Sequence, residues 1–384
     1  MRCPRCLNED PRWFYHGKRG LYCRRCIAFG RVLLEEEKDP VELEKIGEGS
    51  EEYALLYPLT PQQEEIAFAC AKAIDHTDVL LQCVCGAGKT EMTVPLIAKM
   101  LLEKKKVCFA IARRQVVLEV AERLQGYFTN ARVVAVCGGH TEVTDGDLIV
   151  CTTHQLYRYA GVFDCLILDE PDAFPFRGDP ILHGIATTAC VGHVVYLTAT
   201  PDEELQRRVK ERTLQRYVLH VRPHMKPIPV PLIRTGPALL LGVMLVHWLQ
   251  THATHPRMVF VPTIRQANRM YHVLKHMFPC YLCTSKTKDR DGVIAAYRAH
   301  RESVIVATTV LERGVTIKDA DVCVWNADSA VFDEAGLIQM AGRAGRNFER
   351  PYGDVLFLCF EKSELAARCK ATLEEDNRAL SLMR

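Results

Sequence analysis

The sequence predicts an α/β protein with two lobes of parallel sheet and flanking helices, preceded by a small zinc ribbon. From about residue 58, short apolar runs alternate with amphipathic stretches, which is typical of buried parallel strands and their connecting helices. A segment with five prolines interrupts this alternation, and two CxxC pairs lie near the N-terminus. We therefore divide the chain into a zinc-binding domain (1–31), an acidic linker (32–57), a first lobe (58–222), a proline-rich linker (223–237) and a second lobe (238–384).

The apolar runs give the expected strands in chain order. The first lobe has six such runs, at 79–83, 107–112, 133–137, 148–151, 165–168 and 194–197. The second lobe has four, at 258–261, 304–307, 322–325 and 355–360. The stretches between them have the period of amphipathic helices, so we expect each lobe to be a parallel sheet covered by helices.

The composition excludes several classes of protein. The 384 residues are 48% hydrophobic and 25% charged, so the chain buries real cores and is not disordered. Its formal net charge is only +2, so any surface that binds nucleic acid must be local. The longest apolar run, 238–249, is shorter than the about 20 residues that span a bilayer, and we expect a buried helix there. No signal segment opens the chain, which predicts a soluble intracellular protein.

Four cysteines near the N-terminus predict a structural zinc site. Two CxxC pairs with 16 residues between them have the spacing of a four-cysteine ribbon, formed by Cys3, Cys6, Cys23 and Cys26. Between the pairs, the turn-like residues 17–20 lie between aromatic stretches, which predicts a hairpin. Four thiolates leave no open coordination position, so the metal is structural rather than catalytic. A domain of about 30 residues is too small for a hydrophobic core, so the metal supplies its folding energy. A redox dithiol and two disulfides are the alternatives.

The same ribbon is locally basic. Residues 2–31 carry eight Lys or Arg and two acidic residues, with aromatic side chains between them. This charge suits contact with nucleic-acid phosphates. The alternative is the solvated face of a small ribbon, and the sequence leaves both interpretations open.

A glycine-containing loop predicts phosphate binding in the first lobe. Residues 83–90 read CVCGAGKT and follow an expected strand, as in the looser GxGKT form of the phosphate loop. Gly86, Ala87 and Gly88 let backbone amides face phosphate oxygens at a helix N-terminus. Lys89 then reaches the β- and γ-phosphates, and the Thr90 hydroxyl binds Mg²⁺.

Two further motifs complete a site for ATP hydrolysis. The run 165–170 is an apolar strand that ends in two carboxylates: Asp169 can hold Mg²⁺, and Glu170 can orient and deprotonate the attacking water. In the second lobe, Arg343 and Arg346 are three residues apart, so on a helix they share one face. Pointing into a cleft between the lobes, they can stabilise charge on the transferred phosphoryl group.

In this order, the phosphate loop, the Asp–Glu pair and the arginine motif resemble superfamily 2 helicases and translocases. The resemblance implies two RecA-like lobes that bind ATP, with Gln63 reading adenine in a Q-like motif and Gly314 near the nucleotide. It also implies contacts with the nucleic-acid backbone and residues that couple hydrolysis to movement. The backbone contacts would come from Gly138, Gly139, Thr152, Thr153, Thr308 and Thr309, and the coupling from Thr198, Thr200 and Gln339.

Four details narrow the resemblance to the late-competence ComFA family: the leading ribbon, GAGKTEM, DEPDAFPF, and LERGVT before QMAGRAGR. That family implies a translocase that uses ATP to draw single-stranded DNA into competent cells. It would work in the cytoplasm, peripherally at the inner face of the membrane. The implied partners are ComFC, the uptake channel and recombination mediators. The sequence leaves open whether the protein forms a homo-oligomer. Pro171 and the segment 112–114 depart from the family pattern.

Several alternatives stay open. A zinc-bearing repair or replication-restart helicase resembling PriA is one, although that family places its cysteines between helicase motifs. An adaptor that binds DNA under ATP control, with little hydrolysis, is another, whereas an RNA helicase lacks support because no DEAD or DEAH tetrad is present. We expect Cys280 and Cys283 in a buried strand rather than a metal site. Phe174 and Phe176 are expected in the core rather than in a wedge against DNA.

Overall fold

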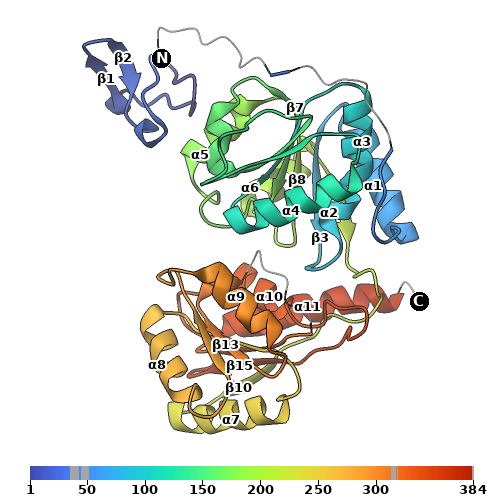
Figure 1. Cartoon of the computed structure of the whole chain (residues 1–384), viewed down its shortest axis with the longest axis vertical. Coiled ribbons are helices and arrows are strands. Elements are labelled where there is room, and N and C mark those ends of the chain that lie inside the picture. Colours follow the sequence, from blue (N-terminus) through green and yellow to red (C-terminus); the bar gives the residue numbers. More distant parts are fainter. Residues whose placement is uncertain (35–42, 45–51, 313–316, 318, 383–384) are drawn as a thin grey trace. The chain divides into compact units, whose positions relative to one another are not determined.

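The computed structural model describes residues 1–34, 43–44, 52–312, 317 and 319–382 (Figure 1). The chain forms two compact units, one of residues 1–83 and 88–219 and the other of residues 84–87 and 220–384. Most of the predicted acidic linker lies outside the described residues. The boundary after Leu219 comes three residues before the predicted end of the first lobe. No helix among the described residues is long and apolar enough to cross a membrane.

The ribbon contains the predicted hairpin. Strands β1 (Phe14–Gly17) and β2 (Gly20–Cys23) are antiparallel and lie between the short helices η1 (Pro11–Trp13) and η2 (Ile27–Phe29). The alternation of a strand gives the hairpin two faces. Phe14 is paired with Cys23 and packs against the buried cysteines, whereas Tyr15 is paired with Tyr22 on the opposite face.

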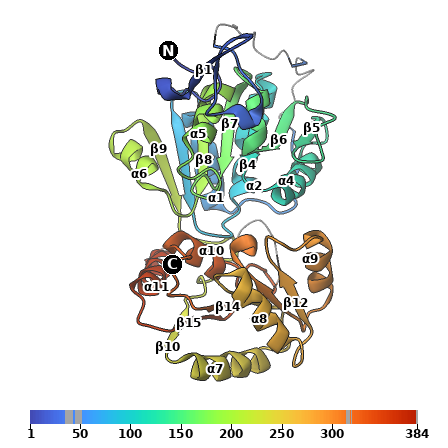
Figure 2. The same ribbon diagram turned by 90° about the vertical axis from the view of Figure 1, so that its left-hand side faces the viewer.

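The rest of the first unit is one parallel sheet of seven strands in the order β5-β6-β4-β7-β8-β3-β9 (Figure 2). The strands are β3 (Asp78–Cys83), β4 (Val107–Ile111), β5 (Val133–Val136), β6 (Leu148–Thr152), β7 (Phe163–Asp169), β8 (Cys190–Thr198) and β9 (Leu214–Leu219). The helices are α1 (Pro61–Ala73), α2 (Lys89–Met92), α3 (Val94–Leu102), α4 (Arg114–Tyr127), η3 (Thr153–Arg158), α5 (Pro180–Ala189) and α6 (Glu203–Lys210). Strands β4 and β6 are buried along their length, as their apolar runs require, whereas the first half of β8 is partly exposed.

The second unit is a parallel sheet of six strands in the order β10-β15-β14-β11-β13-β12. The strands are β10 (Leu232–Thr235), β11 (Arg257–Phe260), β12 (Cys280–Cys283), β13 (Val304–Ala307), β14 (Asp321–Trp325) and β15 (Val355–Cys359). The helices are α7 (Ala238–Thr251), α8 (Ile264–Leu274), α9 (Arg290–Ala299), η4 (Thr309–Leu311), α10 (Glu334–Ala341) and α11 (Glu364–Leu382). An ion pair to a buried carboxylate supports this sheet: Arg350 Nη2 lies 2.9 Å and 3.0 Å from the carboxylate oxygens of Asp321, and the arginine is partly exposed.

The fold confirms the predicted class and each expected strand. The sequence missed β9 and β10, where exposed polar side chains interrupt the apolar run of an edge strand. Cys280 and Cys283 lie in a strand, β12, as expected, but β12 is at the edge of the sheet and only Cys283 is buried. The prediction of a buried helix at 238–249 is wrong in part. Helix α7 forms, but it buries only one stripe of side chains and leaves Leu239 84% exposed.

The ribbon is seated on helix α5 and the short helix η3. At Gly184 of α5, a Cβ atom would lie only 2.1 Å from the Cys6 carbonyl oxygen, so the two backbones are in direct contact. One turn further on, the Thr188 hydroxyl donates a hydrogen bond of 2.7 Å to the Arg5 carbonyl. Phe29 of the ribbon packs against the rings of His154 and Tyr157 in η3. The ribbon is therefore a fixed part of the first unit.

We predict that Gly184→Ala unseats the ribbon. Alanine favours a helix over glycine by about 1 kcal/mol, so α5 itself should gain stability. The added methyl group collides with the Cys6 carbonyl, so the ribbon must move. Hydrogen exchange should quicken in the ribbon and along the face of α5 beneath it. Gly126→Ala in α4, where a Cβ meets nothing within 4 Å, is the control. If hydrogen exchange in the ribbon were the same in both variants, the contact between Gly184 and Cys6 would not be what holds the ribbon on α5.

Candidate nucleotide, metal and nucleic-acid sites

The phosphate loop leaves strand β3 and enters helix α2. Gly86 and Gly88 have φ angles of +82° and +79°, which side chains with a Cβ rarely adopt. Lys89 is the first residue of α2, and Thr90 follows it. The loop therefore has the backbone conformation and the basic and hydroxyl side chains that the sequence predicted. Cys83, which replaces the first glycine of the strict motif, needs no such freedom because it ends the strand.

Gln63 lies against this loop. A Cβ at Gly88 would be 2.6 Å from the Gln63 amide nitrogen, so the glutamine side chain reaches the loop at this residue. Helix α1 fixes the glutamine through a capping box: Thr60 N donates to Gln63 Oε1, and Gln63 N donates to Thr60 Oγ1. Pro61 at the first helical position also sets where α1 begins. The structure thus brings Gln63 and the phosphate loop together within the first unit.

The Asp–Glu pair lies at the same edge of the sheet as the phosphate loop. Asp169 ends strand β7, and β8 separates β7 from β3 in the sheet. All three strands are parallel, so their carboxyl ends share one edge, with β3 and β7 about 10 Å apart. Glu170 has a φ angle of +53°, and its backbone N–H donates to the Leu197 carbonyl of β8. That bond turns the chain sharply directly after Asp169.

A third carboxylate, Asp172, was missed by the sequence reasoning. It is 4% exposed, and its two oxygens accept hydrogen bonds from Thr198 Oγ1 (2.6 Å) and Thr200 Oγ1 (2.8 Å). Thr200 N also donates to Thr198 Oγ1. The segment after the Asp–Glu pair is therefore tied to the two threonines predicted to couple hydrolysis to movement. The only signal in the sequence is that an acidic residue stands three positions after Asp169. The role of that residue becomes visible only once β7 and β8 are known to be adjacent.

The two phenylalanines near this site behave differently. Phe176 is 2% exposed and belongs to the core cluster beneath α5, as predicted. Phe174 is 87% exposed, so the prediction of core packing is wrong for that residue. Asp172, two residues before Phe174, is held by its hydrogen bonds with Thr198 and Thr200. The chain then turns between the two phenylalanines, so their rings point in different directions.

The predicted nucleic-acid contacts of the first unit lie in two segments of the chain. Gly138 and Gly139 are exposed, and Arg114 of α4 donates to the Gly138 carbonyl (2.7 Å), so the altered segment 112–114 supports this turn. Thr152 and Thr153 end β6 and begin η3. Both are buried, at 9% and 2% exposure, and the exposed side chain of this segment is His154. The assignment of these residues to nucleic acid stays a prediction.

In the second unit, the arginines do not lie on a helix. Helix α10 ends at Ala341, so the predicted shared helical face of Arg343 and Arg346 is wrong. Gly345 follows with a φ angle of +64°, and Arg343 Nε donates to the Glu312 carbonyl. Arg222, which is distant in the sequence and 1% exposed, fixes the turn between the two arginines. Arg222 donates to the carbonyls of Gly342, Ala344 and Gly345 at 2.6–3.1 Å.

Arg222 has no signal in the sequence beyond its position before the proline-rich segment. Burial lowers the pKa of its guanidinium to about 10, helped by the nearby charge of Arg346. Carbonyl oxygens at the end of α10 carry the negative end of the helix dipole, which offsets part of that burial.

The remaining predicted residues of the second unit are partly or wholly buried. Gln339 is 2% exposed on α10, and its amide nitrogen has no partner among the described residues. Thr308 is 7% exposed, and Thr309 begins η4. Gly314 lies outside the described residues. The roles given to these residues stay predictions.

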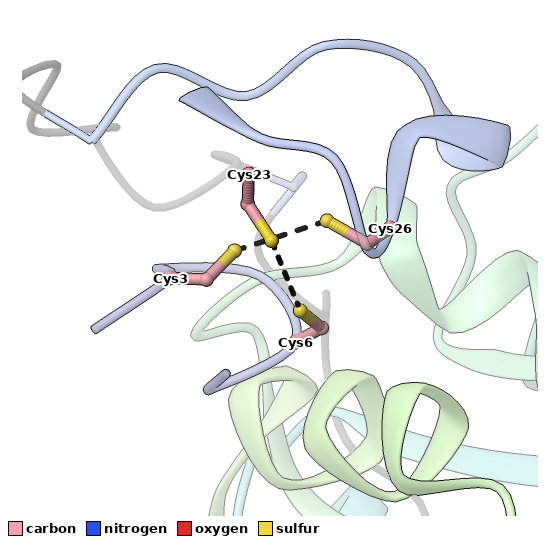
Figure 3. Close-up of side chains that lie close together, drawn as sticks. All are labelled: Cys3, Cys6, Cys23 and Cys26. Atoms are coloured by element: carbon pink, nitrogen blue, oxygen red, sulfur yellow. Dashed lines mark hydrogen bonds between the residues drawn. The ribbon is translucent and has the colours of Figure 1, made fainter. Parts of the chain in front are cut away.

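The four N-terminal cysteines converge as a metal site requires (Figure 3). Their sulfur atoms lie within 4.8 Å of one another, and all four side chains are buried. Cys3–Cys26 and Cys6–Cys23 are each separated by 3.8 Å between sulfurs. Tetrahedral zinc with Zn–S distances of about 2.3 Å gives sulfur–sulfur edges of about 3.8 Å, so the cluster fits this metal. It is the only such cluster among the described residues.

The thiols of this cluster also perturb one another. A hydrogen bond with Cys26 lowers the pKa of the Cys3 thiol to about 2, and the bond with Cys3 raises the pKa of the Cys26 thiol. Close packing therefore cannot by itself ionise all four thiols. A divalent cation at the centre favours the thiolate form at every position, which is why such clusters bind zinc as they fold.

Comparisons with known proteins define the class of protein. The family model "Type III restriction enzyme, res subunit" matches residues 56–203, and "Helicase conserved C-terminal domain" matches residues 240–348. Saccharomyces cerevisiae Dbp5 bound to RNA and ADP BeF3 is 18% identical, with a TM-score of 0.61 over 83% of this chain and 91% of that chain. The DEAD-box helicase Mss116, bound to ssRNA and UDP-BeF, is 16% identical, with a TM-score of 0.62 over 83% and 77%. The protein is an ATPase of helicase superfamily 2 with tandem RecA-like lobes.

The particular family follows from two relatives named competence protein ComFA. The one from Bacillus subtilis (strain 168) is 33% identical over 98% of this chain and 85% of that protein. The one from Streptococcus pneumoniae (strain ATCC BAA-255 / R6) is 32% identical over 92% of this chain and 85% of that protein. The chain therefore belongs to the ComFA family of competence proteins and is an ATP-dependent, helicase-like enzyme.

We predict that Asp172→Ala separates ATP binding from turnover. A hydrogen bond to a charged group contributes about 1.5–3 kcal/mol, so losing the link to β8 should slow nucleic-acid-stimulated hydrolysis about ten- to a hundredfold. ATP affinity should change less than turnover does, because the variant removes the two hydrogen bonds with Thr198 and Thr200, the residues predicted to couple hydrolysis to movement. Thr200→Val should give part of the same defect, and the double variant should be no slower than Asp172→Ala. Additive effects on the rate would show that the two side chains act separately.

We predict one zinc ion per chain. Cys23→Ala should lose that metal and unfold the ribbon, because metal binding and folding of so small a domain are coupled. The two sheets should keep their hydrogen-exchange protection, since their cores include none of the four cysteines. Metal analysis and exchange measurements test both statements. Disulfides within the cluster, found by mass spectrometry of the purified chain, would contradict them.

Proposed function

We propose that this protein is an ATP-driven translocase of single-stranded DNA that takes up transforming DNA during natural competence. One observation carries the proposal: in a chain of the ComFA family, the phosphate loop and the Asp169–Glu170 pair share one edge of a parallel sheet, and Asp172 ties that edge to Thr198 and Thr200. A site that only bound nucleotide would need neither a base for water nor a link from that base to a second motif.

The first unit would bind ATP and activate water. Backbone amides of Gly86–Gly88 and the Lys89 ammonium hold the phosphates, and Gln63 contacts the adenine. Thr90 and Asp169 would hold Mg²⁺, which when bound neutralises charge on the β- and γ-phosphates. Glu170 orients the attacking water and accepts its proton.

The second unit would complete the cycle. Arg343 and Arg346 stabilise charge on the transferred phosphoryl group, and Gly314 contacts the nucleotide. Gln339, with Thr198 and Thr200, links hydrolysis to movement of the DNA. The strand would be held through its backbone by Gly138, Gly139, Thr152, Thr153, Thr308 and Thr309, with His154 as the exposed side chain of that group. Backbone contact gives weak sequence preference and strong salt dependence.

The setting is proposed from the family. The enzyme would act in the cytoplasm, at the inner face of the cell membrane, with ComFC, the DNA-uptake channel and recombination mediators as partners. Assembly into a homo-oligomer is compatible with this role. A repair or replication-restart helicase and an ATP-gated adaptor are the competing functions, and the following experiment separates them.

We predict that single-stranded DNA stimulates ATP hydrolysis more than duplex DNA or RNA does. Steady-state hydrolysis is measured with each polymer and with none. Glu170→Gln should lower the stimulated rate by about 10²–10⁴, because it removes the general base, and Lys89→Ala should abolish turnover by removing phosphate binding. Preference for duplex DNA would favour a repair helicase, and preference for RNA would overturn the assignment. DNA binding with no hydrolysis would favour the adaptor.

A further inference from the structure

The outward face of the ribbon hairpin carries a row of aromatic and cationic side chains. Tyr15 and Tyr22 are paired across the strands, with ring centroids 5.7 Å apart at 69°. The Arg24 guanidinium lies 5.5 Å from the ring centre of Tyr15, and the Arg31 guanidinium lies 4.6 Å from that of Tyr22. We call these four residues the hairpin row.

Core packing does not explain the hairpin row. The opposite face of the hairpin, with Phe14 and Cys23, already supplies the contacts around the metal site. Tyr15 is 51% exposed, and both arginines are exposed. Stacking on the rings holds the guanidinium groups in place before any ligand arrives.

The charge around the row is unbalanced. Residues 2–31 carry eight Lys or Arg and two acidic residues, whereas the rest of the chain has 41 Lys or Arg and 45 Asp or Glu. The two acidic residues of the ribbon pair with other arginines, Glu9 with Arg2 and Asp10 with Arg12. No carboxylate among the described residues pairs with Arg24 or Arg31. The row therefore complements a polyanion.

The seat of the ribbon places the ribbon beside helix η3 of the first unit. Phe29 packs on His154 and Tyr157 of η3, and Arg5 lies over the Tyr157 ring at 5.7 Å. Helix η3 begins with the threonines assigned to the DNA backbone, and His154 is exposed beside them. A strand held at η3 has the ribbon as its immediate neighbour.

We propose that the hairpin row is a second binding surface for single-stranded DNA, with bases stacked on Tyr15 and Tyr22 and phosphates paired with Arg24 and Arg31. The proposal rests on the proposed function and adds a binding surface outside the helicase motifs. Unpaired bases are required, because a duplex hides the base faces that stacking uses. Every base has such a face, so the row holds DNA of any sequence.

The experiment measures binding of labelled oligo-dT to the full chain as a function of salt. Tyr15→Ala/Tyr22→Ala should weaken binding about tenfold or more, whereas Tyr15→Phe/Tyr22→Phe should bind as the wild type does. Arg24→Gln/Arg31→Gln should reduce the salt slope by about 0.7 for each phosphate that is no longer neutralised. Exposed residues away from the ribbon serve as controls, Tyr352→Ala and Arg216→Gln. Zinc content verifies that each ribbon is folded.

The outcomes separate this inference from the proposed function. If the wild type fails to bind oligo-dT, the proposed function itself is wrong. If the wild type binds and the alanine and glutamine variants, with zinc retained, bind equally well, only the hairpin row is wrong. Loss of duplex binding to the same extent as oligo-dT binding would also overturn the inference, because stacking of unpaired bases predicts a selective loss.

Discussion

Parallel pairing of β3, β8 and β7 is the constraint on which the first unit depends. Strands that run in one direction must end at one edge, and the loops that follow them must meet there. The phosphate loop, Thr198 and the Asp169–Glu170 pair are far apart in the chain, yet they require only this pairing to become neighbours. Asp172 then adds a direct link across the edge, so that the segment after the Asp169–Glu170 pair is tied to Thr198 and Thr200.

The ribbon depends on a different kind of constraint. Its own core is four cysteines and a few apolar side chains, a small core to which a zinc ion bound by the cysteines would add folding energy. Its place on the first unit comes from backbone contact at Gly184, one hydrogen bond from Thr188, and the ring of Phe29. Metal chemistry inside the ribbon and shape complementarity outside it are therefore separate requirements. The outward face of the hairpin contributes neither to the cysteine cluster nor to the contact with α5 and η3. Its side chains are therefore available for a ligand.

Sequence reasoning found the features that are local in the chain. The buried strands, the hairpin, the CxxC pairs and the loop before Lys89 each have a pattern within about ten residues, and patterns of this length reflect backbone preference and burial directly. Features that depend on tertiary neighbours were missed. Asp172 acquires its partners only when β8 lies beside β7, and Arg222 acquires its partners only when the chain returns to the end of α10.

The errors have the same origin. An apolar run at 238–249 indicates a helix, but the number of its sides that are covered depends on neighbours, and Leu239 is left exposed. Arg343 and Arg346 have helical spacing, but helix α10 ends before them, and the turn that they occupy has a positive φ at Gly345 and accepts hydrogen bonds from Arg222. Phe174 and Phe176 are chemically identical, and only the turn between them decides which one enters the core.

The contact at Gly184 has a consequence for how freely the ribbon can be exchanged. Because main-chain atoms meet main-chain atoms there, the fit is indifferent to most of the ribbon's side chains. A ribbon from another member of the family, with a different outward face, could be transplanted if it kept the four cysteines, the backbone path around Cys6 and the ring of Phe29. The first unit could then accept ribbons with different outward side chains. The sequence of the outward face could diverge without disturbing the ATPase fold beneath it.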